Sequence, residues 1–204
     1  MRPDFAAVPE LVDIVPGAPL RRTGRARFLR AVGVAPAAHG DSAQILRSVA
    51  DAAYELPLPP KWSEQIDVRG YVYFSSALRT EATWQHPLLT AFRETIEVAA
   101  RLVDRALAAG RLDVVAAGVQ DHLQEVQQRA ARQLQDWSGP HRAEECEDEF
   151  FFNEVTQEST WESPLEAWQY SLHARYWLLV HMLQKMHESL TSSAEGLGVG
   201  VAQA

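Results

Sequence analysis

The sequence has a single cysteine, Cys146, among its 204 residues. One cysteine excludes an intrachain disulfide, so we expect a reducing compartment. Long hydrophobic runs are also missing, because the most apolar stretch, 176–183, is much shorter than the ~20 residues of a membrane-spanning helix. The first residues lack the apolar region of a signal peptide, and Asp4 and Glu10 argue against a transit peptide. We therefore expect a cytoplasmic protein without membrane insertion.

Positive charge is scarce as well. The chain has 19 Lys and Arg against 27 Asp and Glu, a net charge of −8 and a pI near 5.4. This balance disfavours a nucleic-acid partner. Five arginines near the N-terminus stand out, and they form either a solvated helix face or a patch for an acidic partner: Arg21, Arg22, Arg25, Arg27 and Arg30.

Sequence motifs of catalysis and of metal binding are absent. There is no phosphate loop, dinucleotide fingerprint or catalytic triad pattern. His173 and His181 are two turns apart on one predicted helix, too far to share a metal. Cys146 stands among acidic residues, which disfavour the reactive thiolate. We predict that the chain is not an enzyme and binds no metal or cofactor.

Hydrophobic periodicity predicts helices over much of the chain. Two short helices cover 24–33 and 41–56, the second with an N-cap from Asp41-Ser42 and an end set by the prolines that follow. Longer helices cover 88–109 and 112–136. Gly110 is the expected C-cap between them, and Gly118 weakens the second. The two form either an antiparallel hairpin or one kinked rod.

A last helix, 165–190, follows the acidic segment 144–149. Its predicted apolar stripe includes two aromatic residues, and Trp177 and Val180 widen it. The stripe consists of Trp168, Leu172, Tyr176, Leu179, Leu183, Met186 and Leu190. The glycine-containing end of the chain is expected to be flexible.

The most informative pattern is a pair of tryptophans, Trp62 and Trp84, 22 residues apart. Between them lie a turn at Gly70 and the aromatic stretch 71–74, and prolines frame the segment on both sides. This pattern resembles a WW domain, a reader of proline-rich peptides. The resemblance implies a three-stranded antiparallel sheet over 57–88.

The resemblance also implies a role for each side of that sheet. One side is a structural buckle, formed by Leu58, Pro59, Trp62, Phe74 and Pro87. The other is a peptide groove between parallel rings of Tyr73 and Trp84, extended by Tyr71 and Ser75. A polyproline helix suits such a groove, and the Trp84 indole N–H would bond a ligand carbonyl. The alternative is that Tyr73 and Trp84 pack against flanking helices.

Three positions depart from the family pattern. Ser76, Ala77 and Ala82 stand where the family usually has Asn, His and Thr. The half of the groove that reads a tyrosine is therefore missing. The remaining half implies a simpler proline-containing segment as the ligand.

A second, degenerate copy of the pattern covers 137–164. The step Trp-x-x-Pro-Leu recurs, with Trp161 in place of Trp84 and Phe150 in place of Tyr73. The first Trp of this copy should fall at Gly139, and the nearest one, Trp137, is two residues early. Phe150 and Trp161 form either a second groove or a structural remnant packed on helices.

We thus predict a mainly α-helical fold with two small three-stranded antiparallel sheets of WW type, each followed by a long helix. The expected order is an extended lead-in (1–23), short helices packing on the first WW (24–56), a WW domain (57–88), a helical connector (89–136), a degenerate WW-like domain (137–164), a C-terminal helix (165–191) and a flexible tail (192–204).

Residues 24–92 resemble more narrowly the helix-plus-WW module of the WW proteins of centriolar distal appendages. The likeness is carried by Phe28-Leu29-Arg30-Ala31-Val32-Gly33 and by Leu56-Pro57-Leu58-Pro59-Pro60-Lys61-Trp62. In that family the module docks a proline-containing tail of a tau-tubulin kinase during ciliogenesis. This implies a non-enzymatic interaction protein whose partner is a kinase tail or an assembly subunit, at a cilium, basal body or cytoskeleton. The alternative is a structural subunit whose sheets and apolar helices pack on partner chains.

Overall fold

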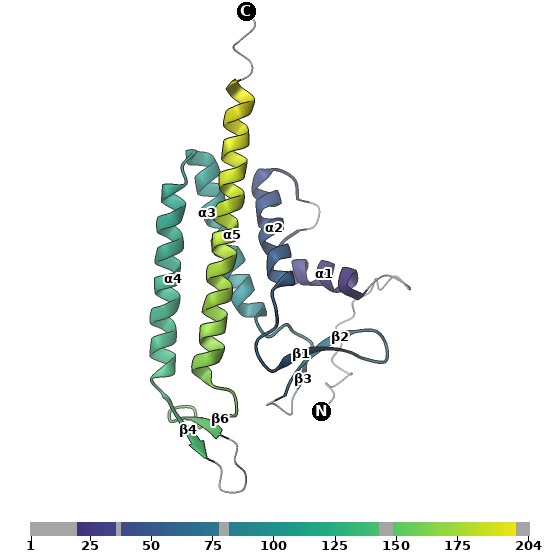
Figure 1. Ribbon diagram of the computed structural model, residues 1–204, viewed down its shortest axis with the longest axis vertical. Helices are drawn as coiled ribbons and strands as arrows, with labels where there is room; N and C mark the ends of the chain where they lie inside the picture. The colour runs from purple at the N-terminus through teal and green to yellow at the C-terminus, as the bar shows by residue number, and fades with distance from the viewer. Residues whose placement is uncertain (1–19, 36–37, 78–81, 143–148, 199–204) are drawn as a thin grey trace, which may run out of the picture. The chain divides into compact units, whose positions relative to one another are not determined.

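The computed structural model describes residues 20–35, 38–77, 82–142 and 149–198. It confirms the predicted fold class, with two three-stranded antiparallel sheets, each followed by a long helix. The elements, shown in Figure 1, are α1 (Leu20–Ala31), α2 (Asp41–Glu55), β1 (Trp62–Ile66), β2 (Val72–Ser76), β3 (Ala82–Thr83), α3 (Leu89–Ala109), α4 (Asp113–Leu134), β4 (Trp137–Arg142), β5 (Glu149–Asn153), β6 (Ser159–Thr160) and α5 (Pro164–Gly198). Most of the predicted lead-in, Cys146 and most of the acidic segment lie outside the described residues.

The chain divides into two compact units. The sheet unit comprises Met1–Gly24, Pro57–Leu89 and Gln124–His173, and it contains both sheets. The helical unit comprises Arg25–Leu56, Thr90–Leu123 and Ala174–Ala204. The candidate groove residues therefore all belong to the sheet unit.

Helix α3 provides much of the core of the helical unit. Phe92, Ile96, Ala99 and Val103 recur at helical spacing and are buried on one side of the helix. Phe28 of α1 packs edge-on against Phe92, with ring centroids 5.8 Å apart. Helix α1 also contacts α2 in this unit, since Phe28 packs on Tyr54 with ring centroids 5.5 Å apart and Arg25 is paired with Asp51.

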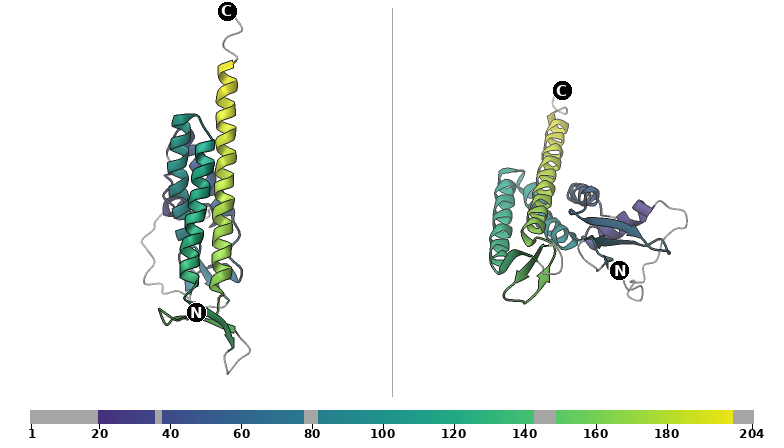
Figure 2. Two further views of the ribbon diagram at one scale, coloured as in Figure 1. Left: turned by 90° about the vertical axis from the view of Figure 1, so that its left-hand side faces the viewer. Right: turned by 60° about the horizontal axis from the view of Figure 1, so that its bottom comes forward.

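Helices α3 and α4 form an antiparallel hairpin, side by side in Figure 2. Gly110 lies between them with φ +63°, and its N–H donates to Ala106 O at 2.7 Å, which confirms it as the C-cap. Gly118 is a point of close approach, because a Cβ there would lie 2.5 Å from Leu102 Cδ2. Leu102 and Gly118 are equally far from Gly110 along the chain, as a hairpin requires. The sequence had identified Gly118 only as a helix-weakening residue.

The N-cap predicted for α2 is wrong. The cap position is Gly40, with φ 100°, and no side chain caps the helix. The Ser42 hydroxyl donates instead to Asp104 Oδ1 at 2.8 Å. Ser42 therefore joins α2 to α3 instead of closing its own helix end.

The buried face predicted for α5 is wrong in part, because Leu179 and Met186 are buried as predicted but the buried face is shifted around the helix. Tyr176 is 54 % exposed and Trp177 is 42 % exposed, although both were assigned to the stripe. The residues that are buried follow a face shifted around the helix, and they are Ala174, Arg175, Leu178, Leu179, Met182 and Met186. Arg175 can enter this face because its guanidinium is paired with Glu94, an arrangement that hydrophobic periodicity does not register. The helix also continues to Gly198, beyond the predicted boundary at 191.

The ion pair between Arg175 and Glu94 gives an asymmetric prediction for stability. Arg175 Nη2 lies 2.8 Å from Glu94 Oε2, and the two side chains are 9 % and 35 % exposed. Glu94→Ala leaves a buried cation without its carboxylate and should cost about 3 kcal/mol of unfolding free energy. Arg175→Met leaves a carboxylate that water can reach, so the cost should be about 1 kcal/mol.

Urea denaturation of both variants measures this difference. Equal losses in the two variants would contradict the burial asymmetry. Arg93→Met is a control for the Arg175→Met change. Arg93 lies beside Glu94 on α3, but its side chain is exposed and donates to Ala31 O.

Candidate functional site

The two sheets share one register. In the first sheet Trp62 pairs with Ser76 and Phe74 pairs with Thr83. In the second sheet the equivalent pairs are Trp137 with Asn153 and Phe151 with Thr160. The central strand is the second in both, so the duplication seen in the sequence is also a duplication of strand pairing.

The position expected for the first Trp of the second copy, Gly139, is wrong. Trp137 occupies the position of the first Trp, because it pairs with Asn153 as Trp62 pairs with Ser76. The register shifts between Ser138 and His141, where two residues of β4 face one residue of β5. This bulge adds one residue to the second copy. The segment 143–148 adds another, because it is one residue longer than the turn 67–71 of the first copy. The two additions explain why the tryptophans are 24 residues apart in the second copy and 22 in the first.

Glycine is required inside this bulge. Gly139 has φ +127°, and a Cβ there would lie 2.9 Å from the backbone oxygen of Phe150. The dipeptide Gly139-Pro140 is the one sequence signal that could have indicated a bulge in this strand. The spacing of the first copy contains no bulge, so it predicted Gly139 for the first Trp.

The repeated Trp-x-x-Pro-Leu step connects a strand to a helix in the same way twice. The Thr83 hydroxyl accepts from Gln85 N at 3.1 Å, and the Thr160 hydroxyl accepts from Glu162 N at 3.1 Å. Two residues after each Trp, a side chain accepts a backbone N–H where the next helix begins. In the first copy His86 Nδ1 accepts from Leu88 N, and in the second Ser163 Oγ accepts from Glu166 N.

The buckle side of the first sheet contains a histidine, His86, that the predicted buckle did not include. The His86 ring packs edge-on against Phe74, with centroids 5.2 Å apart. Burial lowers the pKa of His86 to about 4. The predicted buckle residues on this side are all half-buried, namely Leu58, Pro59, Trp62, Phe74 and Pro87.

The first face, formed by Tyr71, Tyr73, Ser75 and Trp84, is an aromatic cluster with a closed geometry. Both tyrosine rings meet the Trp84 ring edge to face, at 6.4 Å and 88° for Tyr71 and at 5.9 Å and 70° for Tyr73. The expected parallel rings are therefore wrong. Trp84 Nε1 is buried, so in this arrangement the indole N–H does not reach the surface for a ligand carbonyl.

Polar groups lie beside this cluster. The hydroxyls of Ser63 and Ser75 share a hydrogen bond of 3.1 Å across the strands. Gln65 donates to Ser63 Oγ at 3.2 Å, and all three side chains belong to the same side of the sheet as Tyr73. The first face therefore offers hydroxyl and amide groups in place of the indole N–H.

The second face, formed by Ser138, His141, Phe150, Phe152 and Trp161, repeats the arrangement with other side chains. Phe150 meets Trp161 edge to face at 6.0 Å, and His141 lies 5.4 Å from Phe150 on the other side. Trp161 is 44 % exposed. The copy expected to be degenerate therefore has the more exposed tryptophan, since Trp84 is half-buried.

The two sheets are bonded to each other inside the sheet unit. The Ser76 hydroxyl, which is buried, donates to Glu162 Oε1 at 2.8 Å. Ser76 stands where the resemblance expected Asn, so this departure has a structural consequence. In the second copy Asn153 Oδ1 instead accepts from Val155 N and Thr156 N and closes its own turn.

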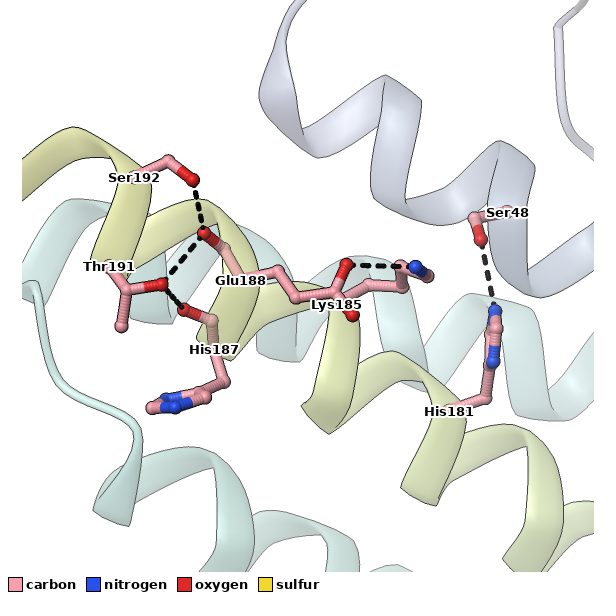
Figure 3. Close-up of polar contacts among 7 residues, drawn as sticks. All are labelled: Ser48, His181, Lys185, His187, Glu188, Thr191 and Ser192. Atoms are coloured by element: carbon pink, nitrogen blue, oxygen red, sulfur yellow. Dashed lines mark hydrogen bonds and ion pairs between the residues drawn. The ribbon is translucent and has the colours of Figure 1, made fainter.

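A separate row of polar side chains follows the C-terminal half of α5 (Figure 3). Its members bond to their own helix or to α2: Lys185 Nζ lies 2.8 Å from Glu188 Oε2, and His181 Nε2 lies 2.9 Å from Ser48 Oγ. Within the part of the chain that the structure describes, no group of His, Cys, Asp and Glu is arranged to hold a metal ion. Nor does any helix among those residues have the length and apolar character to cross a membrane.

Comparisons with known proteins return no match, neither to a family model, nor to a curated protein, nor to a solved structure. The geometry of the two aromatic faces is therefore the basis on which a function can be inferred.

The low pKa of His86 gives a pH prediction. His86 is neutral in the folded protein down to about pH 4, whereas in the unfolded chain it takes up a proton near its ordinary pKa of 6.5. The contribution of neutral His86 to the free energy of unfolding is thus complete above pH 6.5 and is lost as the pH falls toward 4. At pH 4.5 the loss should be about 2 kcal/mol. Protonation also removes the acceptor for Leu88 N.

His86→Ser is the test, since Ser163 caps the equivalent helix end with a group that does not titrate. Unfolding free energies of wild type and His86→Ser should converge as the pH falls from 7 to 4.5. If the unfolding free energies of the two proteins instead changed in parallel over this pH range, His86 would not be the source of the pH dependence.

Proposed function

We propose that the chain is a non-enzymatic interaction protein that binds proline-containing segments on the aromatic faces of its two sheets. The observation that carries this proposal is the repeated ring pair at one register, Tyr73 with Trp84 and Phe150 with Trp161. Each pair lies on the side of its sheet opposite the buckle. Paired aromatic rings on a small sheet are a common way to hold an extended, proline-rich peptide, whose rigid backbone loses little entropy on binding.

The geometry of the first face suggests how a ligand would be held there. With Trp84 Nε1 buried, ring contacts of Tyr71 and Tyr73 would provide the apolar part of recognition. Hydrogen bonds to the ligand backbone would come from the tyrosine hydroxyls, Ser75 and Gln65. A short proline-containing segment without a specificity tyrosine suits this set of groups.

The resemblance of 24–92 to the distal-appendage module supports a cellular setting for this function. We propose a ciliary, basal-body or cytoskeletal assembly, in which the bound segment is a kinase tail or part of another subunit. This setting would be cytoplasmic.

One set of observations favours a second candidate function, that of a structural subunit in a large complex. Tyr176 and Trp177 are exposed on α5, and Trp161 and Leu165 are exposed in the sheet unit. Large apolar side chains in solvent commonly mark surfaces that partner chains cover. Size-exclusion chromatography separates the two functions, since a monodisperse monomer favours the binding module and aggregation without a partner favours the subunit.

Peptide titration tests the leading function. A fluorescent ten-residue oligoproline should bind wild type, and Tyr73→Ala or Trp161→Ala should each weaken the affinity of its own face by about 10-fold, as expected for a central aromatic contact. Trp177→Ala is the matched control, because it removes an exposed tryptophan outside both sheets. Equal affinity in all variants would eliminate both faces as binding sites.

A further inference from the structure

We propose that Ser76, in the first sheet, is a positioning residue for the second face. Its hydroxyl holds Glu162, the residue that follows Trp161, and thereby fixes the turn that carries the Trp161 ring. This inference rests on the proposed function and adds to it an asymmetry between the two copies. The first sheet supports the second face, whereas the equivalent residue of the second sheet is used within its own turn.

The turn after β6 is held by two hydrogen bonds, both made by Glu162. Its backbone N–H donates to Thr160 Oγ1 at 3.1 Å, a bond within the second copy. Its carboxylate oxygen Oε1 accepts from the Ser76 hydroxyl at 2.8 Å, a bond that comes from the first sheet. Ser76 is 6 % exposed, so water is a poor substitute for the carboxylate. Trp161 therefore stands between two residues that are bonded to each other and to the first sheet.

Glu162 meets the first sheet on its buckle side. Successive residues of a strand point to opposite sides of a sheet, so Ser76 points away from the side of Tyr73 and Ser75. The bond between Ser76 and Glu162 thus takes no group from the first face. Its loss should affect the second face selectively.

The Trp161 ring depends on its backbone more than the Trp84 ring does. Two tyrosine rings contact Trp84, whereas Trp161 is 44 % exposed and has the Phe150 ring beside it at 6.0 Å. A ring that is held in place before a ligand arrives loses less conformational freedom when the ligand binds. A fixed turn below Trp161 should therefore increase the affinity of the second face.

The equivalent residues do not form the reverse contact. Gln85 follows Trp84 as Glu162 follows Trp161, and its side chain is exposed. Asn153 occupies the position of Ser76 in the second sheet, and its Oδ1 accepts two backbone N–H groups of its own turn. The support between the copies therefore runs in one direction, and Gln85 provides a matched control.

Titration of the full chain with the fluorescent ten-residue oligoproline measures the two faces in turn. Binding to Tyr73→Ala reports mainly the second face, and binding to Trp161→Ala reports mainly the first. Added to Tyr73→Ala, Ser76→Ala should weaken binding by about 3- to 10-fold, as part of the strength of a hydrogen bond to a charged group. Added to Trp161→Ala, it should change binding by less than about 2-fold.

A double-mutant cycle identifies the bond as the cause. Glu162→Ala should weaken the second face as Ser76→Ala does, and the two changes together should cost no more than either alone, because both remove one bond. Glu162→Gln retains an acceptor oxygen and should restore most of the affinity. Gln85→Ala should have no effect on either face. Since Glu162 is only half-buried, Glu162→Ala serves as the test if Ser76→Ala does not fold.

Tyr170→Phe controls for general loosening between the copies. The Tyr170 hydroxyl donates to Pro57 O at 2.7 Å, so this variant also removes a bond between the first copy and the start of α5. Tyr170 lies nine residues beyond Trp161. A loss of affinity as large as that of Ser76→Ala would overturn the assignment to Ser76.

Fluorine NMR of the chain labelled with 5-fluorotryptophan tests the inference without a ligand. The Trp161 signal is identified by its loss in Trp161→Phe. It should shift and broaden in Ser76→Ala and stay unchanged in Gln85→Ala. An unchanged signal in Ser76→Ala would overturn the inference, whether or not a peptide binds.

The two proposals fail in different ways. If Ser76→Ala weakens both faces equally, or neither, the inference is overturned and the proposed function stands. If wild type does not bind oligoproline, the proposed function fails, and the role of Ser76 in affinity fails with it.

Discussion

The connection between the last strand of a sheet and the helix that follows it is the interaction that the two copies share. It uses the same device twice, a threonine hydroxyl that closes the turn after the last strand and a capping side chain that starts the helix. Because this step begins at the tryptophan in both copies, Trp84 and Trp161 occupy equivalent places after the last strand of their sheets.

The two sheets pair their strands in the same way, and their aromatic faces differ in the side chains around the tryptophan ring. Tyr71 and Tyr73 close on Trp84, so the first face is compact and its indole N–H is turned inward. In the second copy the residues equivalent to Tyr73 and Gln65 are Phe150 and His141, and Trp161 stays in solvent. The same strand pairing used twice thus gives one chain two aromatic surfaces of different accessibility.

Polar groups carry several of the decisive contacts in both units. Ser76 joins the two sheets through Glu162, and Arg175 enters the helical core through its pairing with Glu94. A buried polar group of this kind is tolerated only when its partner is present, so such contacts specify an arrangement more sharply than apolar packing does. Neither contact can be inferred from residue type, because each joins residues more than 80 positions apart.

The sequence by itself determined the helices α3 and α4 and the C-cap at Gly110, because these follow from local periodicity and turn chemistry. The two sheets and the sides on which their aromatic residues lie were implied by the resemblance to WW domains. Only the tertiary structure decided that Trp137 replaces Gly139 as the first Trp, since a bulge changes spacing without changing the pattern. It also decided which side of α5 is buried, a side that includes Arg175 with its partner Glu94, and it set the ring angles that close the first face. Those outcomes depend on contacts between side chains that are far apart in the sequence, and the spacing of residues along the chain does not specify such contacts.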